Sequence, residues 1–314
     1  MVNILISGYY GFDNIGDESI LRTLVSSLRE HIPDCSLTVL SHNPASTREK
    51  YGVEAVDRMS PMAILRAVKK CDMLISGGGS LLQDVTSSKS LHYYLSIIRC
   101  AEFFHKKVFI YSQGIGPIDR PGNRRAAAAA LKRADGIVVR DERSASLLEE
   151  IGIARDKVVI TADPVIRMKK PDGDVGAEIL RKAGVSLDGR LTVGWAIRER
   201  DTDSRFVKEL LRSIQMMKDK YNAQSVLIPF HYEEDGEVCR HIAAQLPDDT
   251  AVCLNEKYLS EDMLSIIGNM DLLVGVRLHS LIYAAIMGVP LVLAYSAAIY
   301  WVFRGKVQLN EHSY

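Results

Sequence analysis

Arg277 and His279 are the residues whose types and spacing most clearly suggest chemistry, because both follow directly on an apolar run. That run, residues 271–276, predicts a buried strand, and open α/β sheets bind ligands at the carboxyl ends of their strands. Ser280 could cap a short helix that begins there. A permanent cation and an imidazole beside the positive end of a helix indicate a site for an anionic substrate that needs proton transfer.

A purely structural role is the alternative for these two residues. The arginine could pair with a surface carboxylate, and the histidine could be satisfied by backbone groups. An isolated Arg-x-His would favour that alternative, whereas its position at the end of a strand favours a ligand site.

Two glycine-rich segments also follow predicted strands. Residues 8–18 contain Gly11, Asn14 and Asp17 after a strand at 2–7. Glycines at a strand-to-helix turn let backbone N–H groups approach a phosphate or carboxylate, although they could equally well only make a tight turn. The spacing is not G-x-G-x-x-G, which disfavours a dinucleotide such as NAD.

The second glycine-rich segment begins with three glycines at 77–79, after an apolar strand at 71–76. These glycines are expected to expose a row of backbone donors. Ser80, Gln83 and Asp84 come next, and they could hydrogen-bond a sugar or cap the next helix. Two such loops at the strand ends of one sheet can line one cleft.

Two arginines and a glutamine stand at other predicted strand ends. Arg140 and Arg198 each follow an apolar strand, where a fixed guanidinium fork can hold a carboxylate or phosphate. Gln113 begins the loop after a strand at 107–112. Pairing of Arg140 with Asp141 or Glu142 is an equally good interpretation of that stretch alone.

The elements alternate along the chain in two α/β series. Predicted strands are 2–7, 37–40, 71–76, 107–112, 137–139, 158–161, 191–197, 225–230, 251–254, 271–276 and 291–294. Predicted helices are 18–29, 61–69, 126–133, 145–151, 206–220, 238–245, 261–268 and a short one from 281 to a glycine–proline stop at 288–290. A polar linker at 168–174 separates domains 1–168 and 169–314. We therefore expect an α/β fold of two Rossmann-like domains that face one another across a cleft.

Composition argues against several classes of protein. A hydrophobic fraction of 47% and a net charge of zero are ordinary for a soluble globular protein and give no indication of nucleic acid binding. Five scattered cysteines without a C-x-x-C pair indicate reduced thiols in a cytoplasm, not zinc or disulfides. We expect no secretory signal, because Met1 leads directly into an apolar strand. The uncharged run 281–303 is long enough to span a membrane, but its internal breakers favour core.

Known catalytic motifs are missing from the sequence. There is no Walker lysine, no G-x-S-x-G elbow and no metal-ligand spacing. The residues themselves therefore predict metal-free chemistry on a small anionic molecule, and they do not define the reaction.

The same segments, taken together, resemble the polysaccharide pyruvyl transferase family, and most closely its bacterial cell-wall members. The matching segments are 8–18, 77–84, Gln113–Pro117, Val139–Glu142, Asp163–Val165 and Arg277–His279, in the family's order and over nearly the whole chain. The resemblance implies a GT-B-like fold. It also implies transfer of the carboxyethylidene unit of phosphoenolpyruvate onto two hydroxyls of a sugar, with release of phosphate and formation of a pyruvate ketal.

Site residues follow from the resemblance and the strand-end positions together. The family's Arg-Leu-His implies phosphoenolpyruvate binding by the second domain at Arg277 and His279, and a further arginine from the first, acceptor-side domain is placed at Arg140. These three are the expected catalytic residues. The residues expected to bind substrate are Gly11, Asn14, Asp17, Gly77, Gly78, Gly79, Ser80, Gln83, Asp84, Gln113, Arg198, Leu278 and Ser280.

The resemblance also implies the partners. The expected acceptor is N-acetylmannosamine in a lipid-linked cell-wall polysaccharide precursor, reached in the cytoplasm or at the inner membrane face. No cofactor or metal is expected, since phosphoenolpyruvate is a substrate. Such ketals are expected to serve S-layer anchoring.

One departure from the family pattern lies at the end of the chain. The family usually carries Asp-Pro-Lys after residues matching 294–296, whereas this chain has an uncharged run at 297–303 and stops at Tyr314. A truncated or altered tail is therefore expected. It leaves open a non-catalytic glycan-binding scaffold, beside the other alternative of a GT-B glycosyltransferase that uses a nucleotide sugar.

Overall fold

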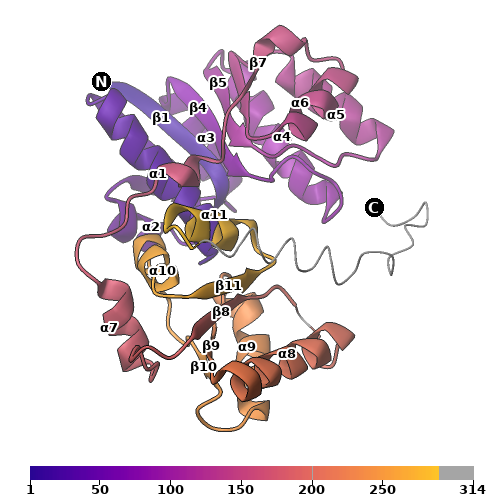
Figure 1. Ribbon diagram of the computed structural model, residues 1–314. Coiled ribbons are helices and arrows are strands. Elements are labelled where there is room, and N and C mark those ends of the chain that lie inside the picture. Colours follow the sequence, from indigo (N-terminus) through magenta and orange to yellow (C-terminus); the bar gives the residue numbers. More distant parts are fainter. Residues whose placement is uncertain (200, 290–314) are drawn as a thin grey trace. The chain divides into compact units, whose positions relative to one another are not determined.

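The computed structural model describes residues 1–199 and 201–289 (Figure 1). The chain divides into two compact units, Met1–Met168 and the part from Lys169 onward. Each unit has a parallel sheet covered by helices, so the α/β class with two Rossmann-like domains is confirmed. The predicted strand at 291–294, the end of the apolar run 281–303 and the altered tail lie outside the described residues.

The first unit contains a seven-stranded parallel sheet in the order β3-β2-β1-β4-β5-β6-β7. Its strands are β1 (Val2–Tyr10), β2 (Cys35–Ser41), β3 (Glu54–Asp57), β4 (Met73–Gly79), β5 (Lys107–Gln113), β6 (Gly136–Val139) and β7 (Val158–Ile160). The order reverses between β1 and β4. Such a switch point is where open parallel sheets bind ligands.

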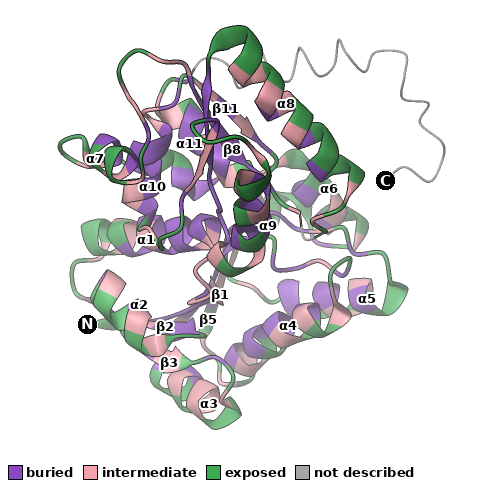
Figure 2. Ribbon diagram, turned by 90° about the horizontal axis from the view of Figure 1, so that it is seen from below, coloured by how far each residue is buried: buried purple, intermediate pink, exposed green. Residues whose placement is uncertain are grey.

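Helices connect these strands. They are α1 (Ile15–His31), α2 (Pro44–Tyr51), α3 (Pro61–Lys70), α4 (Ser88–Phe103), α5 (Pro121–Leu131) and α6 (Glu142–Glu150), with short 3-10 helices η1 (Arg155–Lys157) and η2 (Pro164–Arg167). Their apolar faces are buried and their outer faces are exposed (Figure 2).

The alternation of side chains along β1 explains the two layers of core. Ile4 and Ile6 point to one face and pack with Leu21 and Leu24 of α1. Leu5 points to the other face, into a cluster formed largely by α4, α5 and α6. Because both faces are covered, the central strands are continuous apolar runs, as in other parallel sheets.

Gly78 shows how closely α1 packs on the sheet. A Cβ atom built on Gly78 would lie 2.1 Å from Cγ2 of Ile20, a fully buried side chain of α1. We expect Gly78→Ala to lower the free energy of unfolding by about 1–3 kcal/mol, the usual cost of overpacking a core. Chemical denaturation checks this. Gly122→Ala, where nothing lies within 4 Å, is the matched control, and equal stability of the two variants would contradict the packing role.

The second unit contains a four-stranded parallel sheet in the order β10-β9-β8-β11. Its elements are α7 (Val175–Lys182), β8 (Thr192–Ala196), α8 (Arg205–Tyr221), β9 (Gln224–Leu227), α9 (Tyr232–Gln245), β10 (Ala251–Cys253), α10 (Ser260–Ile267), β11 (Leu272–Gly275) and α11 (Leu278–Ile286). Val193, Trp195, Leu210 and Ile214 belong to its main core cluster.

Several predicted element boundaries were wrong. Ser144 was expected to begin the helix predicted at 145–151, but Asp141 caps α6 and Ser144 lies inside it; Ser260 was expected to cap the helix predicted at 261–268, but α10 begins at Ser260 with Leu259 as its N-cap. Helices α2, α4 and α7 and strand β3 were not predicted. The segments of α2, β3 and α7 have 8, 4 and 8 residues, which leaves little room for a periodic apolar pattern. Helix α4 has 16 residues with apolar side chains at helical spacing, so its signal was present and was missed.

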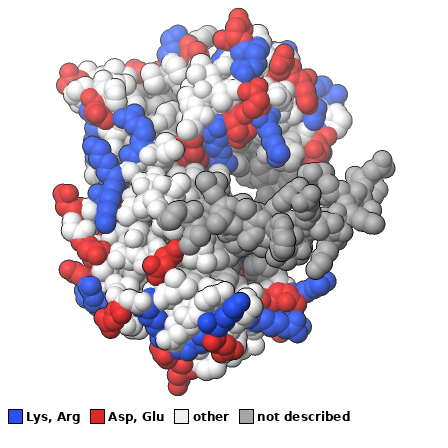
Figure 3. All heavy atoms as spheres, in the orientation of Figure 1, with Lys and Arg blue, Asp and Glu red and all other residues white. Residues whose placement is uncertain are grey.

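The surface charges are mixed, and the cysteines are unpaired. Acidic and basic side chains are interspersed on the face shown in Figure 3. All five cysteines are free thiols. In the part of the chain that the structure describes, no helix is both long and apolar enough to cross a membrane.

Candidate active site

The loop after β1 is held by its own polar groups. Gly11 has a φ of +81°, and a Cβ there would lie 2.2 Å from Ser41 Oγ. Its N–H donates to Glu18 Oε1 at 2.8 Å, and Asn14 caps α1 by accepting from Gly16 N at 3.1 Å. Of the two interpretations of this loop, the structure supports a tight turn at Gly11 and a cap at Asn14.

The carboxyl group of Glu18, in the first turn of α1, binds that loop. Glu18 is buried beneath the loop, and it also accepts a hydrogen bond from the hydroxyl of Tyr51. Burial raises the pKa of its carboxyl, although hydrogen bonds from Tyr51 and Gly11 oppose the shift. Glu18 therefore organises the loop from α1.

The expectation of an exposed row of glycine donors was wrong. Gly77, Gly78 and Gly79 are the last residues of β4, and all three are buried. A Cβ on Gly77 would meet the Tyr10 hydroxyl at 2.6 Å, and one on Gly79 would meet Asp17 Oδ1 at 2.8 Å. These glycines allow close packing at the switch point, and Asp17 lies beside the end of β4.

Gln83 and Asp84 hold neighbouring backbone. Gln83 exchanges hydrogen bonds with Thr86. Asp84 is buried and accepts from Asp119 N, Arg120 N and Asn123 Nδ2 at 2.9, 3.1 and 2.7 Å. Asp84 thus binds the start of α5, and the expected cap of the next helix, α4, is Ser87 instead.

The charge state of Asp84 follows from these bonds. Burial raises the pKa of its carboxyl, but the hydrogen bonds from Asp119, Asn123 and Arg120 outweigh burial and leave the pKa below its ordinary value. A carboxylate with three donors has little remaining capacity to bind a sugar hydroxyl.

Gln113 does not begin the loop after β5, as was predicted. It is the last residue of β5, fully buried, and its Nε2 donates to Ser76 O and Ser76 Oγ at 2.9 and 2.8 Å. These hydrogen bonds therefore join β4 to β5 near the carboxyl ends of the two strands.

Arg140 is held in place by several polar contacts in the first unit. It follows β6, its side chain is 14% exposed, and its Nη1 lies 2.9 Å from Asp163 Oδ2. Its Nη2 donates to Ser80 Oγ at 3.0 Å, and its Nε lies 3.8 Å from Asp141 Oδ2. Asp141 is thus one of its partners, as the alternative interpretation allowed, but the closer carboxylate is Asp163.

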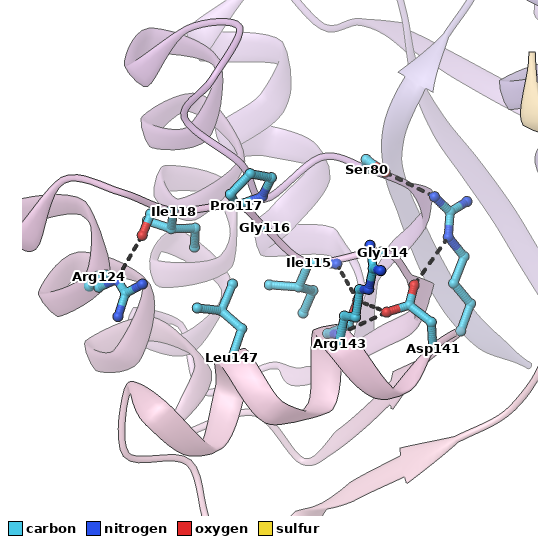
Figure 4. A pocket seen from close by; sticks show the side chains of 12 residues that line it. Ser80, Gly114, Ile115, Gly116, Pro117, Ile118, Arg124, Asp141, Arg143 and Leu147 are labelled. Atoms are coloured by element: carbon cyan, nitrogen blue, oxygen red, sulfur yellow. Dashed lines mark hydrogen bonds and ion pairs between the residues drawn. The ribbon is translucent and has the colours of Figure 1, made fainter. Parts of the chain in front are cut away.

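A cavity of about 430 Å³ opens beside Arg140, between the loop after β5 and the start of α6 (Figure 4). Three arginines line it, Arg124, Arg140 and Arg143, against the single carboxylate of Asp141. Ser144 links the two segments that line the cavity, since its Oγ accepts a hydrogen bond from Ile115 N at 2.8 Å. Arg140 and Arg124 also pair with Asp163 and Glu150, which do not line the cavity, but guanidinium groups in a concave site still suit a small anion.

In the second unit, Arg277 stands where β11 ends and α11 begins. Arg277 itself is the N-cap of α11, so the expected capping by Ser280 was wrong. Ser280 is fully buried inside the helix, and its hydroxyl donates to Arg277 O at 2.7 Å. Leu278 is 47% exposed, and His279 lies half-buried in the same first turn.

The guanidinium of Arg277 is fixed by a buried carboxylate. Its Nη2 donates to Asp235 Oδ1, and the Asp235 side chain is 1% exposed. The other Asp235 oxygen accepts from His231 N at 2.8 Å. The structural alternative for Arg277 invoked a surface carboxylate; the partner is instead buried, which orients the arginine at the sheet edge.

Another strand end of this sheet carries Arg198. It follows β8, the strand that pairs with β11, and it is exposed. Within the described ranges, 1–199 and 201–289, no group of three or more His, Cys, Asp or Glu side chains could hold a metal ion.

The polar residues of these sites that were not singled out from the sequence are Arg124, Arg143, Ser144, His231 and Asp235. The first three line the cavity, Asp235 binds Arg277, and the backbone N–H of His231 binds Asp235. His231 had the same signal as Arg277, because it directly follows a predicted strand, whereas Asp235 comes four residues later.

Several solved structures are similar in fold to this chain. They include HepE from Anabaena in complex with UDP-glucose, with a TM-score of 0.62 and 11% identity over 92% of this chain and 79% of that one. UDP-GlcNAc 2-epimerase from Methanocaldococcus jannaschii matches with a TM-score of 0.59 and 13% identity over 92% and 82%. ADP-heptose heptosyltransferase II from E. coli matches with a TM-score of 0.51 and 13% identity over 91% and 82%. The fold is therefore of the GT-B-like type.

Sequence comparison narrows this class to a family. The polysaccharide pyruvyl transferase model matches residues 14–296, so the chain belongs to that family and is a transferase. The amylovoran biosynthesis protein AmsJ of Erwinia amylovora is 21% identical to it, over 93% of this chain and 82% of that protein.

Proposed function

We propose that the protein transfers the carboxyethylidene unit of phosphoenolpyruvate onto two hydroxyls of a sugar in a lipid-linked polysaccharide precursor. The observation that carries this proposal is the start of α11, where Arg277, oriented by Asp235, and His279 lie two residues apart at a strand end. An oriented guanidinium binds an anionic oxygen, and an imidazole can move a proton near neutral pH. Family membership supplies the reaction class.

The chemistry requires two proton movements. The two acceptor hydroxyls form bonds to C2 of the donor, and the bond from C2 to the phosphate oxygen breaks. One hydroxyl proton ends on the methylene carbon, which becomes a methyl group, and the other ends on the released phosphate. His279 is assigned the proton transfer to or from the reacting groups.

Arginines are assigned to the charges of the donor. Phosphoenolpyruvate carries a carboxylate and a phosphate, and guanidinium groups such as those of Arg277 and Arg140 are suitable charged hydrogen-bond donors to groups of this kind. Backbone and side-chain groups beside Arg140, including Ser80, add hydrogen-bond donors. No cofactor is needed, because the donor already has the oxidation level of the ketal.

The acceptor and the location of the enzyme are finer parts of the proposal. We propose N-acetylmannosamine of a secondary cell-wall polysaccharide precursor, used in the cytoplasm at the inner membrane face, where a lipid-linked acceptor would be met. The support is the resemblance to the cell-wall members of the family. Incubation with phosphoenolpyruvate and a panel of sugar acceptors tests this acceptor. We expect phosphate release and an acid-labile ketal with N-acetylmannosamine. Phosphate release only with other sugars would contradict N-acetylmannosamine as the acceptor.

Arg140→Ala is expected to weaken phosphoenolpyruvate binding by about 10- to 100-fold, as for a lost charge-assisted hydrogen bond. Titration calorimetry measures this directly. Arg125→Ala, an exposed arginine on α5, is the control and should bind as the wild type does. Unchanged affinity in Arg140→Ala would remove Arg140 from the donor site.

A further inference from the structure

His231 is a buried histidine with a defined tautomer. It follows β9, is 6% exposed, and caps α9 by accepting from Glu234 N at its Nδ1, at 3.2 Å. An Nδ1 atom that accepts a backbone N–H carries no proton. In the neutral imidazole the proton is then on Nε2, which makes Nε2 a hydrogen-bond donor.

This Nε2 donor is unused. It is buried and has no hydrogen-bond partner among the described residues. Buried donors are almost always paired, because an unpaired one loses its hydration without compensation. An atom of this kind at the carboxyl end of a parallel strand points to a ligand that supplies the acceptor.

Arg277 has a second unused donor of the same kind. Its Nε is buried and without a hydrogen-bond partner in the described part of the chain. Asp235 ties the two residues together, since one of its oxygens accepts from His231 N and the other from Arg277 Nη2. One buried carboxylate therefore fixes two side chains that each retain an unsatisfied N–H group.

We propose that His231 is a further substrate-binding residue, whose Nε2–H, with Nε–H of Arg277, binds negatively charged oxygens of the donor. The ligand class is a carboxylate or a phosphate, and the inference rests on the proposed function for the identity of the donor. Asp235 is a positioning residue for both side chains.

His231→Asn separates this role from the capping of α9. Asparagine is a preferred N-cap residue and can accept from Glu234 N through its own Oδ1. It is too short to place a donor where Nε2 lies. We expect the melting temperature to stay at the wild-type value, while the dissociation constant for phosphoenolpyruvate, measured by calorimetry on the folded protein, rises about tenfold or more.

His241→Asn is the matched control, because His241 lies on the same helix and its ring bonds Gln245. Its affinity should be unchanged. Parallel titrations with inorganic phosphate and with pyruvate show which donor group His231 contacts, and the affinity for one of them should fall in His231→Asn. Wild-type affinity of His231→Asn for all three compounds would overturn the inference.

A second measurement does not depend on the variant. The ¹⁵N chemical shifts of the His231 ring should show a protonated Nε2 and a bare Nδ1, and the reverse tautomer would contradict the inference. Failure of the wild-type protein to bind phosphoenolpyruvate contradicts the proposed function itself, whereas wild-type binding with an unaffected His231→Asn contradicts only this inference.

Discussion

His279→Ala is expected to reduce turnover by roughly two to four orders of magnitude, the usual contribution of a general acid or base. His279 lies half-buried in the first turn of α11, so its removal should leave the fold intact. Phosphoenolpyruvate affinity should fall only modestly, because the charge of Arg277 remains. Steady-state phosphate release, calorimetry and a melting curve on the one variant measure all three quantities.

A structural histidine would give a different pattern. The melting temperature would fall, and the folded fraction would turn over at a near-normal rate. His241→Ala on α9 is a suitable control for the general effect of removing a half-buried imidazole. Near-normal turnover in His279→Ala would remove His279 from the mechanism.

Arg277→Ala is expected to weaken donor binding strongly, by about 1.5–3 kcal/mol for a lost hydrogen bond to a charged group. It should also destabilise the second unit by about 3–5 kcal/mol, because the Asp235 carboxylate would remain buried without its partner. Calorimetry and chemical denaturation measure the two losses separately.

Arg277→Lys distinguishes the binding role from the structural one. An ammonium preserves a charge near Asp235, so much of the stability should return, but it cannot reproduce the planar fork. Donor affinity should therefore stay low while stability recovers. Full recovery of affinity together with stability would show that Arg277 acts only as the counter-ion of Asp235.

The parts of the fold set by apolar periodicity could be predicted from the sequence. Runs such as 71–76 and 271–276 became β4 and β11, and both sites lie at strand ends because parallel sheets place loops there. The order of the motifs was sufficient to indicate the family.

Contacts between distant residues could not be predicted in this way. Arg277 and Asp235 are 42 positions apart, and nothing local indicates that a carboxylate in the first turn of α9 is buried against α11. The structural role of the glycine-rich segments was equally ambiguous in the sequence. Gly78 is required by Ile20 of α1, a packing demand that becomes visible only when the helix lies on the sheet.

A nucleotide-sugar glycosyltransferase is the main competing function. HepE, which has the same fold, was solved in complex with UDP-glucose, and likeness at that identity shows the fold alone. A glycosyltransferase of this kind would be expected to carry a glutamate near the ribose, ahead of a Gly-x-Pro such as residues 288–290, but helix α11 has no carboxylate. Thermal stabilisation by UDP or GDP, without stabilisation by phosphoenolpyruvate, would favour this alternative.

A glycan-binding scaffold without turnover is the other competitor. It predicts binding of glycan without binding of phosphoenolpyruvate. Titration of both ligands into the wild-type protein separates it from the transferase, because a bound donor has no role in a scaffold.

The most direct test is to incubate the wild-type protein with phosphoenolpyruvate and a lipid-linked N-acetylmannosamine acceptor, and to measure phosphate and ketal together. We expect equal amounts of phosphate and acid-labile pyruvate ketal, with almost none of either in His279→Ala. Absence of phosphate release with every sugar acceptor offered, from protein that is shown to be folded, would contradict pyruvyl transfer by this chain.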